Sequence, residues 1–124
     1  MIQAQENAAL VRSVYAAFRE RRRADAEALL APEFRFTSPY DDAIGRAAFF
    51  ARCWPNGDRI SAFEIERITA DSDGAFITYS CTVCDGASFR NTAYLTVKHG
   101  RITSANVYFG VSYRDGAFVP KSEE

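Results

Sequence analysis

Two cysteines three positions apart, Cys81 and Cys84, have the C-x-x-C spacing of many zinc and redox sites. The surrounding segment, AFITYSCTVC over residues 75–84, alternates like a β-strand. Side chains three positions apart on a strand point to opposite faces of the sheet, so both sulfurs cannot easily bind one metal ion. Of the remaining residues, His99 alone could complete a zinc ligand set. We therefore expect these two cysteines and Cys53 to be reduced thiols, with no metal site.

Acid–base chemistry has few candidates in this sequence. His99 and Asp85 each precede a glycine between strand-like runs, where turn formation explains them. Asp41 and Asp42 remain, and capping of a loop or helix is the alternative for both. Glycine-rich phosphate loops of either standard type are absent from the sequence, and we expect no cofactor.

Length and composition indicate one globular domain spanning residues 1–124. The 124 residues are 48% hydrophobic, and 15 Lys and Arg balance 16 Asp and Glu. This balance excludes a disordered polyelectrolyte and a strongly cationic nucleic-acid binder. No run approaches the ~18 apolar residues of a transmembrane helix, and the first ten residues lack a signal-peptide pattern. We expect a soluble, cytoplasmic protein without a nucleic-acid or membrane partner.

The first half of the chain has helical periodicity. Apolar residues Val11, Val14, Tyr15 and Phe18 follow the spacing of one buried stripe and predict a helix over residues 4–23.

A short helix over residues 26–30 is predicted next, with Asp25 as its N-cap and Pro32 stopping it. The following segment, residues 33–38, alternates like a short edge strand that Pro39 ends.

The second half of the chain is predicted to be mostly strand. A loop over residues 40–44 leads into a helix over residues 46–54, and residues 59–109 form four antiparallel strands. The turns between these strands are marked by Asp71 to Gly74, Asp85-Gly86 and His99-Gly100. Helices first and strands later indicate an α+β fold with helices on one face of a bent sheet. From about residue 114 the chain is expected to be a loosely ordered tail.

This order of elements resembles the nuclear transport factor 2-like fold, which includes SnoaL-like polyketide cyclases and ketosteroid isomerases. Family members have segments similar to ADAEALLAPEFRFTSP (residues 24–39) and FRNTAYLTVKHGRITSANVYFG (residues 89–110). The segment RAAFFARCWPN (residues 46–56) is similar to segments of uncharacterised bacterial members. The resemblance implies a cone-shaped half-barrel of a strongly bent, mainly antiparallel sheet covered by three N-terminal helices. It also implies an apolar pocket and a homodimer formed through the outer sheet face.

The resemblance does not carry over the isomerase chemistry. The family's proton-removing aspartate corresponds to Ser38 here, directly before Pro39, and its second carboxylic acid falls near Ala93. A serine hydroxyl without a neighbouring base cannot replace an aspartate at neutral pH, because a general base needs a pKa near the working pH.

Four polar residues are predicted to line the pocket: Tyr15, Ser38, Tyr79 and Asn91. For the tyrosines the alternative is a core role with hydroxyls bonded to backbone carbonyls. Asp41 is the candidate acid–base residue, because it follows Ser38 by three positions in a loop that can reach the pocket mouth.

Two classes of function remain open. One is a module that binds a small apolar or cyclic carbonyl-type ligand. The presence of Ser38 in place of the family's proton-removing aspartate favours this class. The other is an isomerase, cyclase or dehydratase that acts on such a ligand without a cofactor.

Overall fold

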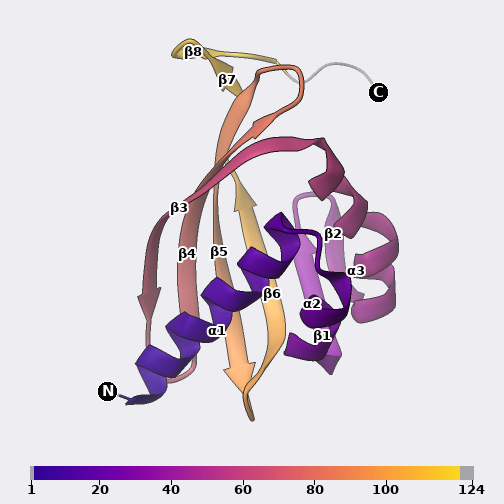
Figure 1. Cartoon of the computed structure of the whole chain (residues 1–124), viewed down its shortest axis with the longest axis vertical. Coiled ribbons are helices and arrows are strands. Elements are labelled where there is room, and N and C mark those ends of the chain that lie inside the picture. Colours follow the sequence, from indigo (N-terminus) through magenta and orange to yellow (C-terminus); the bar gives the residue numbers. More distant parts are fainter. Residues whose placement is uncertain (1, 121–124) are drawn as a thin grey trace.

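A strongly bent sheet with helices on its concave side forms the molecule (Figure 1). The computed structural model describes residues 2–120. The strand order along the sheet is β2-β1-β6-β5-β4-β3, with β1 parallel to β6 and the other neighbours antiparallel. The helical elements are α1 (Ile2–Arg19), α2 (Arg23–Leu29), α3 (Arg46–Arg52) and a 3-10 helix, η1 (Trp54–Arg59). The strands are β1 (Leu30–Ser38), β2 (Asp41–Gly45), β3 (Ile60–Ala70), β4 (Gly74–Val83), β5 (Ser88–Lys98), β6 (Arg101–Phe109), β7 (Tyr113–Arg114) and β8 (Ala117–Phe118). The α+β class and the cone shape are thus confirmed.

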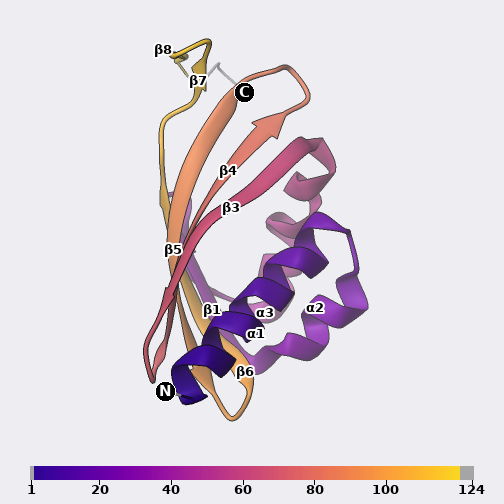
Figure 2. The ribbon, with the colours of Figure 1, turned by 60° about the vertical axis from the view of Figure 1, so that its left-hand side comes forward.

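The long strands bend around α1, which crosses the concave face of the sheet (Figure 2). The pairing register shifts twice between β3 and β4 and once between β5 and β6. Such irregularities increase local twist and let a sheet curl. The core fills the space between α1 and the sheet, where Val11 and Ala17 meet Ile77 and Ile102, all fully buried.

The predicted alternation of β4 is confirmed. Ala75, Ile77, Tyr79 and Cys81 are all buried on the concave face. On the opposite, outer face Phe76 is 48% exposed, and its ring lies 4.6 Å from that of Tyr94.

Several predicted boundaries are wrong. The first helix spans residues 2–19 rather than 4–23, because Arg21 adopts a left-handed φ of 59°. Asp25 lies inside α2 and is not its N-cap; that position is Arg22, without a side-chain cap. The third helix ends at Arg52, and the segment Pro55 to Gly57 continues as 3-10 helix.

The first strand was predicted as an edge strand, and this is also wrong. β1 starts at Leu30 and lies between β2 and β6, and the segment predicted as the loop 40–44 forms the edge strand β2. Pro32 lies within β1, in a stretch where the pairing with β6 is irregular, so its missing N–H is tolerated there.

The predicted tail contains β7 and β8, which pair with each other, and β7 also pairs with β5. Its last four residues lie outside the described part of the chain.

The N-terminal half of α1 is fixed by an asparagine side chain. Asn7 is 1% exposed, and its Nδ2 donates to the carbonyl of Asp71 in the β3–β4 turn at 2.9 Å. Gln3 donates to Asn7 Oδ1 at 2.8 Å. Two segments 64 residues apart in sequence are thereby joined.

We predict that Asn7→Ala lowers the free energy of unfolding by about 1–3 kcal/mol, because it leaves the Asp71 carbonyl without its buried donor. Urea unfolding measures this value. Gln5→Ala, at an exposed position of the same helix, is the control and should change it by less than about 0.5 kcal/mol. Equal effects of the two substitutions would contradict the anchoring role.

Candidate functional site

Three of the predicted polar site residues meet under α1, and we call Tyr15, Tyr79 and Asn91 the phenol–amide cluster. Tyr79 on β4 and Asn91 on β5 are register partners, and Asn91 Nδ2 donates to the Tyr79 hydroxyl at 3.3 Å. The Tyr15 ring comes from α1 and lies 5.1 Å from the Tyr79 ring. Tyr79 is 8% and Asn91 is 7% exposed. Both tyrosine rings pack in or against the core, and the Tyr79 hydroxyl bonds to the Asn91 side chain rather than to a backbone carbonyl.

The direction of these hydrogen bonds follows from one backbone group. The N–H of Gly110 can only donate, and it contacts Asn91 Oδ1 at 3.2 Å. The amide oxygen is thereby committed, so the amide NH2 faces Tyr79. Gly110 also donates to the carbonyl of Arg90 at 2.8 Å, and a Cβ at position 110 would lie 2.1 Å from that carbonyl oxygen. This close approach requires glycine.

The Tyr79 oxygen accepts the hydrogen bond from Asn91, so its own O–H is left to donate. The nearby Tyr15 is a further, smaller influence than burial on the pKa of Tyr79, and it acts to lower it. Tyr79 is therefore a hydrogen-bond donor of this cluster.

Burial keeps both phenols protonated. It is the main cause that raises the pKa of Tyr79 to about 12, against the lowering effect of the Asn91 hydrogen bond. Burial, followed by the neighbouring Tyr79, raises the pKa of Tyr15 well above its usual value. At neutral pH both residues act as hydrogen-bond donors and neither acts as a base.

An aromatic wall lies beside the cluster. The ring of Phe63 on β3 stacks at 5.1 Å from Tyr79 and 6.1 Å from Tyr15. Cys81 is the register partner of Phe63, and burial raises the pKa of its thiol to about 12. A protonated thiol is unreactive, so Cys81 serves as an apolar surface.

The other two predicted residues, Ser38 and Asp41, lie in a separate group. We call this group the carboxylate cluster, and it also includes Arg52 and Cys53. Asp41 is not in a flexible loop as predicted but begins β2, as the register partner of Ser38. Its side chain is only 8% exposed and forms an ion pair with Arg52 at 2.8 Å. Ser38 donates to Asp41 Oδ2 at 3.1 Å, and the Cys53 thiol lies 3.6 Å from the same oxygen.

The carboxylate also acts on its neighbouring thiol. Burial, then the charge of Asp41 and its hydrogen bond, raises the pKa of Cys53 to about 12, although Arg52 opposes the shift. Cys53 therefore remains a thiol at neutral pH and can donate to the carboxylate.

The two cysteines of the C-x-x-C pair differ in position and in burial. Cys81 is buried, whereas Cys84 is exposed beyond the end of β4 and its thiol contacts the carbonyl of Arg59 at 3.0 Å. His99 adopts a left-handed φ of 53° in the β5–β6 turn, as expected of a turn residue. Within residues 2–120 we find no group of three side chains arranged to hold a metal ion. In the same range no helix is long and apolar enough to cross a membrane.

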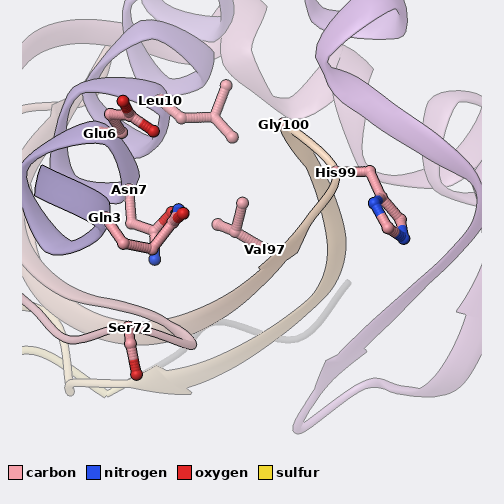
Figure 3. A pocket seen from close by; sticks show the side chains of 8 residues that line it. All are labelled: Gln3, Glu6, Asn7, Leu10, Ser72, Val97, His99 and Gly100. Carbon is pink, nitrogen blue, oxygen red and sulfur yellow. The ribbon is translucent and has the colours of Figure 1, made fainter.

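Two hollows in the surface lie away from the phenol–amide cluster. One, of about 480 Å³, is at the narrow end of the cone between α1 and the turns of the sheet (Figure 3). Its amides, Gln3 and Asn7, point to each other, and the His99 side chain is turned away from them. The second hollow, of about 410 Å³, lies where β1 leaves β6 and includes Ser38, Val107 and Phe109.

Several contacts of the two clusters were missed by sequence reasoning. Phe63 and Gly110 come from segments far from their partners, and no local pattern indicates such contacts. Arg52 and Cys53 were predicted to lie within the helix over residues 46–54, and the β1–β2 pairing brings Asp41 to them. The glycine after the last long strand is a weak signal of close backbone approach.

Comparisons with known proteins identify a family and a shared fold. The family described as SnoaL-like domain matches residues 11–105. A candidate ketosteroid isomerase from Kribbella flavida DSM 17836 superposes with a TM-score of 0.74 at 18% identity, covering 98% of this chain and 93% of that one. A candidate polyketide cyclase from Xanthomonas campestris pv. campestris has a TM-score of 0.71 at 22% identity, covering 87% and 93%. An LEH-like epoxide hydrolase from M. tuberculosis has a TM-score of 0.70 at 20% identity, covering 86% and 84%. None of the curated proteins matches the sequence.

We predict that the protein loses stability as the pH rises above about 9. Unfolded thiols and phenols ionise near their ordinary pKa values of 9.0 and 10.0, whereas Cys53, Cys81 and Tyr79 hold their protons to about 12 when folded. The unfolded state then binds fewer protons, so the free energy of unfolding falls with pH. Tyr79→Phe should reduce this fall by about 1.4 kcal/mol per pH unit between pH 10 and 12. Urea unfolding at each pH measures it, with Tyr108→Phe, at a 60% exposed ring, as the control that keeps the full slope.

Proposed function

The chain belongs to the SnoaL-like family, and from this premise and the phenol–amide cluster we propose that it binds a small apolar, cyclic molecule through a carbonyl oxygen. The observation that carries the proposal is the direction of the hydrogen bonds at Tyr79. Gly110 commits the Asn91 oxygen, and the Asn91 amide nitrogen donates to the Tyr79 hydroxyl. Tyr79 is left as a donor, and the ligand atom that matches a donor is an acceptor.

The surroundings of the cluster support an apolar ligand. Phe63 on β3 and Phe89 on β5, the register partner of Cys81, are only partly buried while packed against the core. Such side chains provide most of the binding energy of a small-molecule site, and a few polar groups orient the ligand. The named activities of the structural neighbours, isomerase, cyclase and epoxide hydrolase, are compatible with small organic ligands.

A second candidate is an isomerase, cyclase or dehydratase that acts on the same ligand without a cofactor. It is favoured by the position of Asp41, a carboxylate that is 8% exposed and hydrogen-bonded to Ser38 at the place where the resemblance puts the acid–base residue. Exchange of the α-hydrogens of 2-tetralone with D2O distinguishes the two candidates. Faster exchange with the protein, lost in Asp41→Asn, would favour the enzyme over the binding module.

We predict that the protein binds 2-tetralone, a bicyclic ketone, and that Tyr79→Phe weakens this binding about tenfold by removing one hydrogen bond. Tetralin, the same molecule without the carbonyl, should bind both proteins equally. Calorimetric or NMR titration gives these affinities, with Tyr108→Phe as the control on the outer sheet face. Unchanged affinity of Tyr79→Phe for 2-tetralone would contradict the proposal.

The outer sheet face supports a homodimer. The sequence favours Tyr94 with Val107 or Phe109 as the apolar residues of this face. Tyr94 lies there, whereas Val107 is 7% exposed on the concave face and Phe109 shares that face as the register partner of Asn91. Tyr108, at 60% exposure, lies on the outer face with Phe76 and Tyr94. An uncovered sheet face with several large aromatic rings is typical of an association surface.

The expected cytoplasmic location stays a prediction.

Light scattering at micromolar concentration should give about twice the 13.8 kDa mass of one chain. Phe76→Lys, which places a charge in the centre of this face, should give the mass of a monomer. Lys98→Glu, at an exposed strand end, is a control that should leave the dimer intact. A monomeric wild-type protein would refute the association.

A further inference from the structure

The hollow at the narrow end of the cone lies apart from both clusters. Its volume is about 480 Å³, and its lining residues come from α1, the β3–β4 turn, the end of β5 and the β5–β6 turn. No member of the phenol–amide cluster or of the carboxylate cluster lines it. A molecule in this hollow would therefore meet a different set of side chains from the one proposed to bind a ketone.

One side of the hollow is apolar. Val97 on β5 is 9% exposed, and Leu10 on α1 is partly buried against the core. Figure 3 shows these two side chains in the space between α1 and the sheet. An apolar surface next to a few polar groups is the usual composition of a small-molecule site.

A backbone carbonyl determines which way the two amide side chains of the hollow face. The carbonyl of Asp71 can only accept, and Asn7 Nδ2 donates to it at 2.9 Å. Asn7 Oδ1 is then the atom that faces Gln3, and it accepts from Gln3 Nε2 at 2.8 Å. The Gln3 nitrogen is thereby turned towards Asn7, and no hydrogen bond to Gln3 Oε1 is made within residues 2–120. Because Gln3 is an exposed residue, this oxygen is left as an acceptor at the hollow.

A carboxylate lies beside this acceptor. Glu6 follows Gln3 by three positions, so the two side chains are neighbours on one face of α1. Glu6 is exposed, and its carboxylate has no hydrogen bond or ion pair to another of the described residues. An ionised carboxylate can only accept hydrogen bonds. Two adjacent side chains of the hollow therefore offer acceptors, and one of them is negatively charged.

The charges at the hollow disfavour an anion. Among the eight residues of Figure 3, Glu6 is the acid and His99 is the group that can become a cation. The His99 side chain is turned away from the amides of Gln3 and Asn7 (Figure 3). The polar side of the hollow thus matches a ligand that carries positive charge and donates hydrogen bonds.

We propose that this hollow binds the primary ammonium group of a small organic cation, whose apolar stem lies against Leu10 and Val97. An ammonium group has three N–H donors and no acceptor, which complements the Gln3 oxygen and the Glu6 carboxylate. The bond to the carboxylate is charge-assisted and stronger than a neutral one. A metal ion fits less well, because within residues 2–120 we find no group of three side chains arranged to hold one. The inference is independent of the proposed function, since the two ligands share no residue.

Three matched probes test the inference: benzylammonium, benzyltrimethylammonium and benzyl alcohol. They share the aromatic ring; the first has charge and N–H donors, the second has charge alone, and the third is neutral. The wild-type protein should bind benzylammonium about fivefold more tightly than either of the others, as expected of an ion pair open to solvent. NMR titration measures the affinities, and the backbone amide signals of Ser72 and Gly100 should shift.

Glu6→Gln should abolish the preference for benzylammonium, because the neutral amide no longer offers a charged acceptor. Glu33→Gln is the matched control, since it removes the same charge from an exposed position on β1 and should leave the preference intact. Far-UV circular dichroism establishes that both variants are folded. The affinity for 2-tetralone should be the same in Glu6→Gln and in the wild-type protein.

Three results would overturn the inference. The first is equal affinity of the wild-type protein for the three probes. The second is an equal loss of benzylammonium binding in Glu6→Gln and Glu33→Gln, which would indicate general attraction to the charge of the protein. The third is a shift of the Tyr79 and Asn91 signals in place of those of Ser72 and Gly100. Each of these results leaves the binding of 2-tetralone, and with it the proposed function, unaffected.

Discussion

The concave face of the sheet must be covered, and the covering helix determines the rest of the structure. A sheet that bends this strongly gathers its buried side chains in a narrow space, which α1 fills with its apolar stripe. The Asn7 amide fixes one end of α1 to the β3–β4 turn, and the arginine at position 21 secures the other end by donating to the carbonyl of Trp54 at 2.8 Å. Between these two anchors lies Tyr15, which is thereby held over Tyr79. The two contacts that anchor α1 to the rest of the fold therefore also position Tyr15 over Tyr79.

One backbone N–H determines the polarity of the site. An amide side chain is ambiguous by itself, because its two ends exchange donor and acceptor when it flips. Gly110 removes the ambiguity at Asn91, and the choice passes on to Tyr79 through a directed hydrogen bond. The glycine is required by its close approach to the Arg90 carbonyl, not by a left-handed φ. A structural constraint at the end of β6 therefore becomes a chemical preference several ångströms away.

The sequence predicted what depends on local periodicity. The helical stripe and the alternation of β4 placed Tyr15 and Tyr79 on facing surfaces, and these two residues do meet. What failed depends on partners distant in the chain. β1 was predicted as an edge strand because Pro39 ends it and a proline cannot donate to a β-ladder. Parallel pairing with β6 nevertheless places β1 inside the sheet. The pairing of β1 with β2 likewise moved Asp41 from an expected loop into a buried ion pair, which no local pattern indicates.

The placement of Asp41 shows how a pairing between distant segments changes the surroundings of one side chain. A carboxylate withdrawn from water needs compensation by charges and hydrogen bonds. Here the Arg52 guanidinium lies 2.8 Å from Oδ1, and the Ser38 hydroxyl and the Cys53 thiol contact Oδ2. Ser38 reaches Asp41 because β2 pairs with β1, and Arg52 and Cys53 reach it because α3 ends beside this pair. The pairing that withdraws the carboxylate from water therefore also supplies its partners.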